Sequence, residues 1–375
     1  MAVEGAVLCE QLNLYDCIQC GKCTGGCPVS IRSALNPRKL IYEALLGTRF
    51  VPVERTEIWE CTTCATCAER CPKSVRPYEV VLALRSDIIE SGRVKPAVRD
   101  AMESTFMHGN PWGSVREKRS DWMGDLKVRV LNEGEKVDLL YFVCCTAAYD
   151  PRVQELPKAM VKVLQKAGID FAVLGNAESC CGNEMGELGE KGLFEMAQEN
   201  NVELFAKYQF PRMMTTSPHC FHAFLNEYPK QAFDVFHYTQ MLSRFIEEER
   251  LILEGELPKK VTYHDPCFLG KQNKVFDEPR RVLQSIPGVE YLEMDRSRER
   301  SLCCEGGGGR MWMESESTEE RLAEVRVRDA VSMGAEILAT ACPFCLLTLE
   351  DAVKTTGNEE KIIVRDIVEL VAEVV

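Results

Sequence analysis

Two short runs of cysteines carry the spacing of a metal-binding site. Residues 17–27 read CIQCGKCTGGC and residues 61–71 read CTTCATCAERC, so both follow the pattern C-x2-C-x2-C-x3-C with a proline immediately after the fourth cysteine. Thiolates at these intervals hold 4Fe-4S clusters. Zinc sites or disulfides are the alternatives, but three thiols spaced by two residues fit a cube-shaped cluster better than one tetrahedral zinc. The runs therefore predict two four-iron clusters.

Each run is expected to lend one ligand to the other. In two-cluster ferredoxin-type domains, the fourth cysteine of one run reaches the cluster held by the other run. The predicted ligand sets are Cys17, Cys20, Cys23 and Cys71 for one cluster, and Cys61, Cys64, Cys67 and Cys27 for the other.

A second group of cysteines lies in an internal repeat. The two copies align at separations of 122 to 125 residues, which pair Cys145, Cys180, Cys181 and Cys220 of the first copy with Cys267, Cys303, Cys304 and Cys345 of the second. The second copy also has Cys342, and its five thiols exceed what a cube-shaped cluster needs. Adjacent thiols are difficult to place on one tetrahedral zinc, so this copy favours a multi-iron centre.

The first copy lacks one of these thiols. Ser217 stands where the second copy has Cys342, and a hydroxyl is a poorer ligand than a thiolate for an iron-sulfur centre. The four remaining thiols predict an ordinary four-cysteine cubane cluster, with a zinc site or an empty site as the alternatives. Cys144 is adjacent to Cys145, and the sequence leaves open which of the two is the ligand.

The elements that must position these cysteines divide the chain into units. Residues 1–95 are mostly helical, with helices expected over NPRKLIYEALLG, ending at Gly47, and over YEVVLALRSDIIESG, ending near Gly92. Residues 96–136 are rich in glycine, proline and charge, which favours a surface linker. The two repeats cover residues 137–258 and 259–375.

Short apolar runs alternate with amphipathic stretches inside each repeat, which predicts small parallel sheets. Ligands of such sheets bind at the carboxyl ends of the strands, so the cysteines of each repeat are expected to converge on one edge. The predicted fold is α+β and multidomain: a helical two-cluster ferredoxin-like domain followed by two tandem α/β cysteine-rich repeats.

The composition disfavours several classes of function. A formal charge of -13 disfavours nucleic acid as a partner. No apolar run approaches the ~20 residues that span a bilayer, and no signal peptide is recognisable, so a cytoplasmic protein is expected. Nineteen cysteines in that compartment indicate metal ligands. Without a nucleotide-binding fingerprint, flavin or nicotinamide chemistry would belong to a partner.

Some residues near the cysteines are further candidates. His264 and His219 lie within three residues of a predicted ligand, and either is a candidate proton donor to a departing thiolate, with packing as the alternative. The run from Gly306 to Gly309 predicts close backbone approach to a cluster. Three basic residues are expected on a solvated helix face, with binding of an anionic substrate arm as the alternative: Lys271, Arg280 and Arg281.

The whole chain resembles heterodisulfide reductase. The resemblance rests on CIQCGKCTGGCP, IWECTTCATCAERCP, GNPWG, ESCCG, and HDPCFLG with CPFC. Residues 1–95 resemble its small ferredoxin-type C subunit and the repeats resemble its catalytic B subunit, a fusion similar to the D subunit of the membrane-linked enzyme. In that family a complete five-cysteine repeat holds a noncubane 4Fe-4S cluster, and two such clusters cleave the disulfide of coenzyme M and coenzyme B.

The resemblance implies a noncubane cluster with a catalytic role on the complete repeat, at Cys267, Cys303, Cys304, Cys342 and Cys345. It implies an iron-sulfur subunit of an anaerobic oxidoreductase complex, which passes electrons from two ferredoxin clusters to a noncubane cluster that reduces a disulfide. The implied partner is similar to the flavin-containing A subunit of heterodisulfide reductase, or is a membrane or tungsten subunit.

Two departures from the family pattern favour an alternative. Besides Ser217, Glu305 stands where the second CCG motif has its glycine. The alternative is a pure electron relay for a flavin or tungsten partner, similar to subunits of benzoyl-CoA reductase or hydroxy-acid dehydrogenase complexes.

Overall fold

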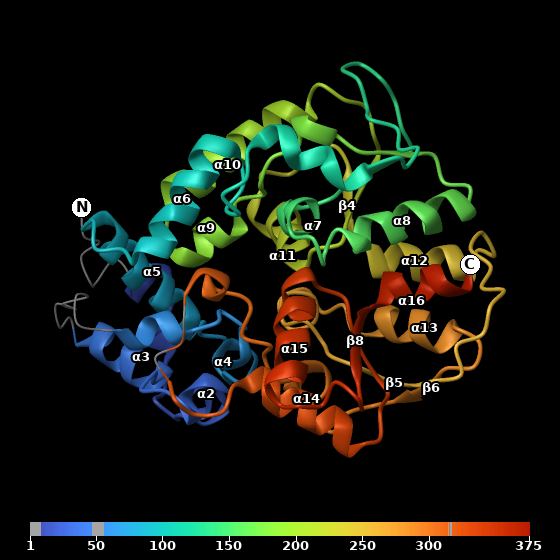
Figure 1. Ribbon diagram of the computed structural model, residues 1–375. Helices are drawn as coiled ribbons and strands as arrows, with labels where there is room; N and C mark the ends of the chain where they lie inside the picture. The colour runs from blue at the N-terminus through green and yellow to red at the C-terminus, as the bar shows by residue number, and fades with distance from the viewer. Residues whose placement is uncertain (1–8, 47–55, 314, 316) are drawn as a thin grey trace.

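A helical unit precedes two strand-containing units in the computed structural model, which describes residues 9–46, 56–313, 315 and 317–375. Figure 1 shows the helical unit in blue beside the first repeat in green and yellow and the second repeat in orange and red. No helix of these described residues combines the length and apolarity needed to cross a bilayer.

The two helices expected in the first unit are confirmed as α3 (Pro37–Leu45) and α5 (Pro77–Glu90). Each begins with a proline, whose missing N–H would have had no partner in the first turn. Gly47, the expected end of the first helix, lies outside the described residues. The shorter helices here are η1 (Leu14–Asp16), α2 (Lys22–Gly26), η2 (Val29–Ile31), η4 (Thr56–Glu60) and α4 (Thr66–Glu69).

Residues 96–136, expected to form a surface linker, instead contain α6 (Pro96–His108) and η5 (Arg116–Met123). Asn110, Arg119 and Trp122 are buried there. The Asn110 side chain donates to Ser114 O and accepts from the Trp112 amide, which fixes the GNPWG turn. The glycine and proline that suggest a surface connection thus belong to a turn between two packed helices.

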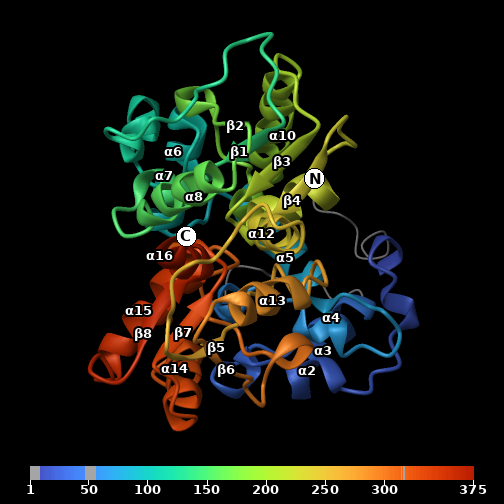
Figure 2. The ribbon, with the colours of Figure 1, turned by 90° about the vertical axis from the view of Figure 1, so that its right-hand side faces the viewer.

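Each repeat contains one four-stranded parallel sheet, as the strand-helix alternation predicts. The strand orders are equivalent, β2-β1-β3-β4 and β6-β5-β7-β8. Figure 2 shows the two sheets one above the other, with α12 and α13 between them. The strands are β1 (Leu139–Phe142), β2 (Phe171–Ala172), β3 (Arg212–Thr215), β4 (Asp234–His237), β5 (Lys260–Tyr263), β6 (Glu290–Leu292), β7 (Ile337–Thr340) and β8 (Ile363–Asp366).

Helices and turns connect these strands. In the first repeat they are α7 (Cys145–Tyr149), α8 (Glu155–Lys166), η6 (Gly175–Ala177), α9 (Asn183–Leu188), α10 (Lys191–Phe205), α11 (Pro218–His222), the π-helical turn η7 (Ala223–Glu227) and α12 (Tyr238–Glu247). In the second they are α13 (Asp277–Ser285), η8 (Arg298–Arg300), η9 (Arg310–Trp312), α14 (Leu322–Ser332), α15 (Pro343–Thr355) and α16 (Ile367–Val374).

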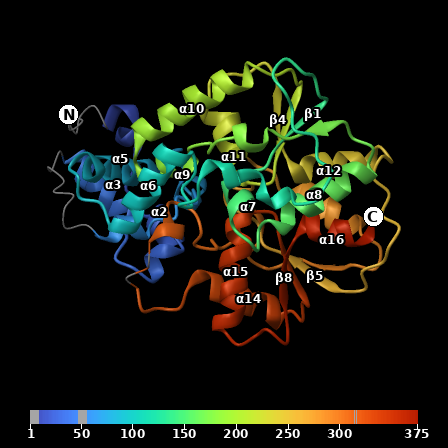
Figure 3. The same ribbon diagram turned by 45° about the horizontal axis from the view of Figure 1, so that its top comes forward.

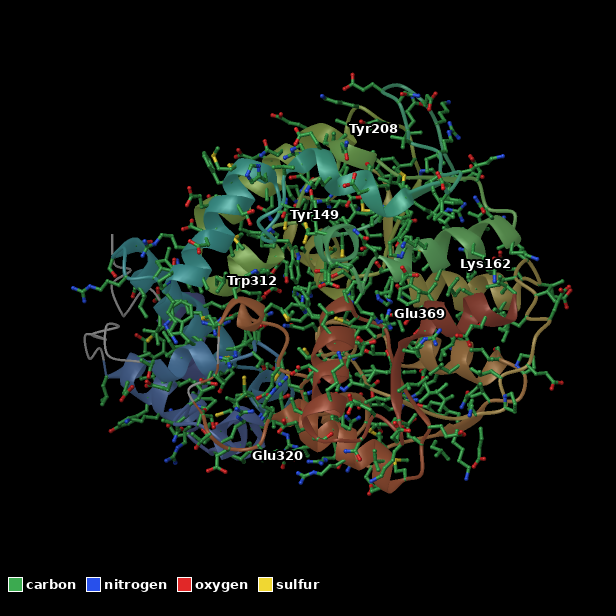
Figure 4. The ribbon with its side chains drawn as sticks, in the orientation of Figure 1. Tyr149, Lys162, Tyr208, Trp312, Glu320 and Glu369 are labelled. Atoms are coloured by element: carbon green, nitrogen blue, oxygen red, sulfur yellow. The ribbon has the colours of Figure 1, made fainter. Side chains whose placement is uncertain are left out.

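The two repeats pack through equivalent helices. α8 lies against α16, as Figures 1 and 3 show, and α12 lies against α13. Since α12 corresponds to α16 and α8 to α13, each repeat offers the same pair of helices to the other. Arg152 extends this interface by donating to Glu350 and to Glu369, the latter labelled in Figure 4.

Asp366 begins α16 in the middle of this interface. Its Oδ1 accepts from the Tyr238 hydroxyl at 2.6 Å and from the Val368 amide at 3.0 Å. Burial raises the pKa of Asp366 from 3.8 to about 7. A carboxyl group whose pKa is raised on folding stabilises the protein at low pH, and this stability is lost as the pH rises through about 7.

The substitution Asp366→Asn should remove that loss, because asparagine keeps the acceptor oxygen but does not ionise. Between pH 5 and pH 8 the free energy of unfolding should fall by about 2–3 kcal/mol less in the variant than in the natural protein. Chemical denaturation under anaerobic conditions measures both, with the exposed Asp138→Asn as the control. Identical pH profiles for Asp366→Asn and the natural protein would contradict this assignment.

Candidate metal centres

The two cysteine runs fold into matching loops. Gln19 and Thr63 are the third residues of their runs, with φ of 56° and 50°. Gly21 and Ala65 are the fifth residues, with φ of 79° and 58°. These left-handed residues turn each chain so that its first three thiols face one side. The same local backbone therefore recurs in both runs, in agreement with their shared spacing.

Each predicted ligand set lines a pocket of its own, and each pocket draws on both runs. Cys17, Cys20 and Cys23 share one pocket with Cys71. The second pocket is lined by the other four cysteines, Cys27, Cys61, Cys64 and Cys67. The structure thus brings together the sets that the motif indicates, with the fourth cysteine of each run in the pocket of the other.

The donor set of the second pocket fits a cationic group. Burial raises the pKa of Cys61 to about 12, and it raises the pKa of Cys67 well above the usual value of 9.0. A bare thiolate is therefore disfavoured in this pocket. Bound metal ions deprotonate coordinating thiols, so an iron-sulfur cluster would satisfy groups that are otherwise held neutral.

The five thiols of the second repeat form a continuous series. Cys267 contacts Cys303, which contacts Cys304. The Sγ atoms of Cys304 and Cys345 lie 3.2 Å apart, and Cys345 contacts Cys342. All five side chains are buried. Burial raises the pKa of Cys342, but the Cys345 hydrogen bond and the His219 charge lower it to about 7, so one thiolate forms readily here.

His264 lies beside this series, close to Cys304 and Cys345. Burial and the neighbouring Arg326 guanidinium, whose Nε donates to His264 Nδ1, lower the pKa of His264 to about 3. An imidazole that is neutral at pH 7 is a weak acid. Of the two roles that the sequence leaves open for His264, these surroundings therefore favour packing beside the thiols over proton donation.

The thiols of the first repeat line one pocket together with Ser217. Cys144 and Cys145 both line this pocket, whereas the sequence leaves open which of the two is the ligand. The contacts run from Cys145 to Cys180, then to Cys181, Cys220 and Cys144. Hydrogen bonds from Cys180 and Cys220 lower the pKa of Cys181 to about 6.

A buried ion pair holds one side of this pocket. Arg119 donates to Glu178 at 2.5 Å and approaches the Cys145 Sγ at 3.5 Å. The Glu178 carboxylate in turn accepts from the amides of Val143 and Cys144. Sequence reasoning missed Arg119 because it lies in the charged segment expected to be a linker.

The Cys144 backbone is strained. Its φ of 71° and ψ of 158° lie in a region that is essentially reserved for glycine. A side chain in that conformation costs about 1–3 kcal/mol and persists only where its surroundings impose it. Here the Glu178 carboxylate supplies the constraint.

His219 lies between the cysteines of the first repeat and those of the second repeat. Its ring packs against Phe268 and Phe344, at centroid distances of 4.2 and 4.9 Å. Burial alone would lower the pKa of His219. Glu184, 3.0 Å from its Nδ1, has the larger opposite effect and raises the pKa to about 9. Of the two candidate histidines, His219 is the one that carries a proton at pH 7.

The second repeat lies directly against the second ferredoxin run. Cys303 contacts Cys64, and its Sγ donates to the Thr62 hydroxyl at 3.3 Å. Lys271 Nζ donates to the Thr66 hydroxyl at 2.8 Å and to Ser301 O at 2.6 Å. The ligand sets predicted for two different centres thus touch each other.

The prediction of a solvated helix face is wrong for two of the three basic residues singled out in the sequence. Lys271 is buried in the contact just described, and Arg280 is buried in a double ion pair with Asp265 and Glu293. Arg281 alone of the three is exposed, beside Glu247. The partner that buries Lys271, Thr66, is 205 residues away in the sequence, whereas the acids that pair with Arg280 are 15 and 13 residues away.

The glycine run of the second repeat approaches the second cysteine run closely. A Cβ at Gly308, where φ is 67°, would lie 2.9 Å from Cys61 O, and one at Gly307 would lie 3.3 Å from Thr62 O. Trp312, labelled in Figure 4, follows this run and donates from Nε1 to Pro111 O in the GNPWG turn. The loop therefore joins three parts of the molecule.

Arg85 of α5 fastens the same junction. Its guanidinium donates to four backbone carbonyls, with distances of 2.6 to 3.0 Å, at Ile58, Cys61, Glu187 and Gly308. These acceptors belong to the helical unit and to both repeats, and Arg85 is fully buried.

Comparison with known proteins identifies the family. The 4Fe-4S dicluster domain model matches residues 13–75, and the cysteine-rich domain model matches residues 139–225 and 261–350. The D subunit of the dihydromethanophenazine:CoB–CoM heterodisulfide reductase of Methanosarcina barkeri is 33% identical over 396 residues, which cover 97% of this chain and 94% of that protein. The chain belongs to the family of this heterodisulfide reductase subunit. The matched domains are those of an iron-sulfur oxidoreductase subunit, as the sequence predicts.

Other relatives of this heterodisulfide reductase family member are longer. The probable iron-sulfur-binding oxidoreductase FadF of Bacillus subtilis is 35% identical over 76% of this chain and 42% of its own length. The EtfAB:quinone oxidoreductase of Syntrophomonas wolfei is 32% identical over 78% of this chain and 43% of its own length. The aligned part is thus less than half of these two proteins.

Solved structures share the fold. A hypothetical protein of Helicobacter pylori superposes with a TM-score of 0.57 at 13% identity, over 91% of this chain and 68% of that one.

Proposed function

We propose that this chain passes electrons from the two ferredoxin-type clusters to a noncubane 4Fe-4S cluster in the second repeat, where a disulfide is reduced. The ligands of that cluster are Cys267, Cys303, Cys304, Cys342 and Cys345. The observation that carries the proposal is the contact between Cys64 and Cys303, because it joins the ligand sets of the second ferredoxin cluster and of the complete repeat. When bound, the clusters supply one-electron redox chemistry.

The residues around this contact exclude water from the proposed electron path and place a positive charge beside it. The thiols of both sets are buried, so water is excluded from the path between them. The Lys271 ammonium lies beside Cys64, where its charge favours the thiolate. Because a buried cation stabilises an added negative charge, Lys271 would favour reduction of a centre in this position.

Disulfide reduction needs two electrons and two protons, and it releases two thiols. The electrons come from a redox partner through the ferredoxin unit, for which a flavin-containing subunit is our proposed source. His219 is the better proton source of the two histidines, since it is protonated at pH 7 and held at Nδ1 by Glu184. His219 also lies close enough to Cys342 for their charges to interact, so its proton is beside the thiols of the second repeat, where the disulfide is reduced.

The test is disulfide-dependent oxidation of a reduced viologen by the anaerobically isolated, iron-loaded protein. We expect turnover with a disulfide, release of two thiols per two electrons, and a new electron paramagnetic resonance signal when the oxidised protein is treated with thiol. Absence of turnover and of a thiol-dependent signal, in protein with about 16 irons in four clusters, would overturn the proposed disulfide reaction.

Electron relay without a disulfide substrate is a second candidate. Ser217 leaves the first repeat without the cysteine pair of the second, and a relative is named EtfAB:quinone oxidoreductase. In that case a reduced electron-transferring flavoprotein should reduce the clusters, and a disulfide should leave the spectrum of the reduced protein unchanged. Slow reduction by the flavoprotein, with fast reoxidation by a disulfide, would exclude the relay.

A further inference from the structure

The thiols of the two repeats make the same series of contacts, although their sequences do not contain the same cysteines. In the second repeat the series ends with Cys342, which contacts Cys345. In the first repeat the residue equivalent to Cys345 is Cys220, and the thiol that contacts it at the end of the series is Cys144. Cys144 thus occupies the contact that Ser217 cannot make.

Cys144 reaches this position from a different strand. Cys342 and Ser217 follow equivalent strands, β7 and β3, whereas Cys144 follows β1. The residue equivalent to Cys144 in the second repeat is Pro266, which has no thiol. The last thiol of the series therefore follows a different strand in each repeat, which alignment of the two repeats does not reveal.

The surroundings force Cys144 to point its thiol into the pocket. Glu178 accepts from the Cys144 amide at 3.1 Å and from the Val143 amide at 2.9 Å, and Arg119 fixes Glu178. This clamp imposes a glycine-like backbone on a residue with a side chain, and residues held in such conformations cluster at functional sites. Ser217 meanwhile caps α11, its Oγ accepting from the Cys220 amide.

We infer that Cys144 and Cys145 are both cluster ligands, with Cys144 replacing the thiol missing at position 217. The alignment of the repeats assigns four thiols to the first repeat, and Cys144 makes a fifth. The five thiolates presented to a multi-iron centre are then Cys144, Cys145, Cys180, Cys181 and Cys220. The inference rests on the proposed function only in that the first repeat must hold an iron-sulfur cluster. The Arg119 guanidinium, 3.5 Å from the Cys145 Sγ, partly balances the added charge.

Cys144→Gly is the decisive variant, because glycine suits the backbone and removes only the thiol. We expect the variant to fold at least as well as the natural protein. In protein grown on 57Fe, iron per chain should fall by up to one quarter, and the Mössbauer component of the first-repeat centre should disappear or change. Cys144→Gly combined with Ser217→Cys, which returns a thiol at the position equivalent to Cys342, should restore both iron content and spectrum.

The outcomes separate the possible failures. An unchanged iron content and Mössbauer spectrum in Cys144→Gly would overturn this inference and leave the proposed function standing. Natural protein with iron in the ferredoxin unit alone would overturn both. Cys9→Ala is the matched control, since Cys9 is a buried thiol that donates to Ala44 O and lines none of the cysteine pockets described above.

Discussion

Replacing Cys304 by alanine will abolish disulfide reduction and leave the ferredoxin signals in place. Cys304 lies in the middle of the thiol series of the second repeat, where it contacts Cys303 and Cys345. Hydrogen bonds from these two neighbours lower its pKa well below 9.0 despite its burial, which favours its thiolate form. Its loss should remove about four of about 16 irons.

The ferredoxin signals should survive because Cys27, Cys61, Cys64 and Cys67 line a separate pocket. Viologen-linked turnover, iron content and electron paramagnetic resonance of the reduced protein measure the three expectations. Cys9→Ala is again the control for loss of a buried thiol. Disulfide reduction at the natural rate by Cys304→Ala would place the reaction elsewhere, whereas loss of partner-linked turnover alone would favour the relay.

Replacing Arg85 by leucine will weaken the attachment of the helical unit to the repeats. Leucine fills part of the space but removes the Arg85 donor from four buried carbonyl oxygens, of which Ile58 O still accepts from the Cys61 amide at 3.3 Å. An unsatisfied buried acceptor costs about 1–3 kcal/mol, so loss of the donor to the other three oxygens should lower the unfolding free energy by at least about 3 kcal/mol. Arg85→Lys should fall between, because an ammonium has three donors and cannot reach four carbonyls in the same geometry.

Denaturation and limited proteolysis of the anaerobic protein measure this effect. Earlier release of the helical unit than in the natural protein is expected, since the four acceptors lie in all three parts of the molecule. The control is Arg99→Leu, at an exposed position of α6, which should change stability by less than about 0.5 kcal/mol. A loss below about 1 kcal/mol in Arg85→Leu would show that these hydrogen bonds contribute little.

Features that depend on neighbouring residues or on repetition could be predicted from the sequence. Regular cysteine spacing indicates both ferredoxin-type sets, and the structure places them in two pockets. The duplicated pattern of strands, helices and cysteines predicts the two parallel sheets, because each copy must bury its own apolar runs.

Features that depend on contacts between distant residues could not be predicted. Arg85, Arg119 and Lys271 are charged residues whose local sequence is typical of a solvated surface. Their burial is decided by acceptors up to 223 residues away, such as Gly308 for Arg85. The role inferred for Cys144 was equally hidden, because the thiol that it replaces lies on another strand.

The interface between the repeats suggests how such a chain originates. Packing of α8 on α16 and of α12 on α13 is the self-complementary arrangement of a two-fold dimer. A polypeptide with one repeat would bury the same faces by pairing with an identical copy. Covalent fusion makes that pairing independent of concentration and frees each half to change separately. The ancestral symmetry would then be preserved in the sheets and lost in the chemistry, where histidine at 219 faces phenylalanine at 344.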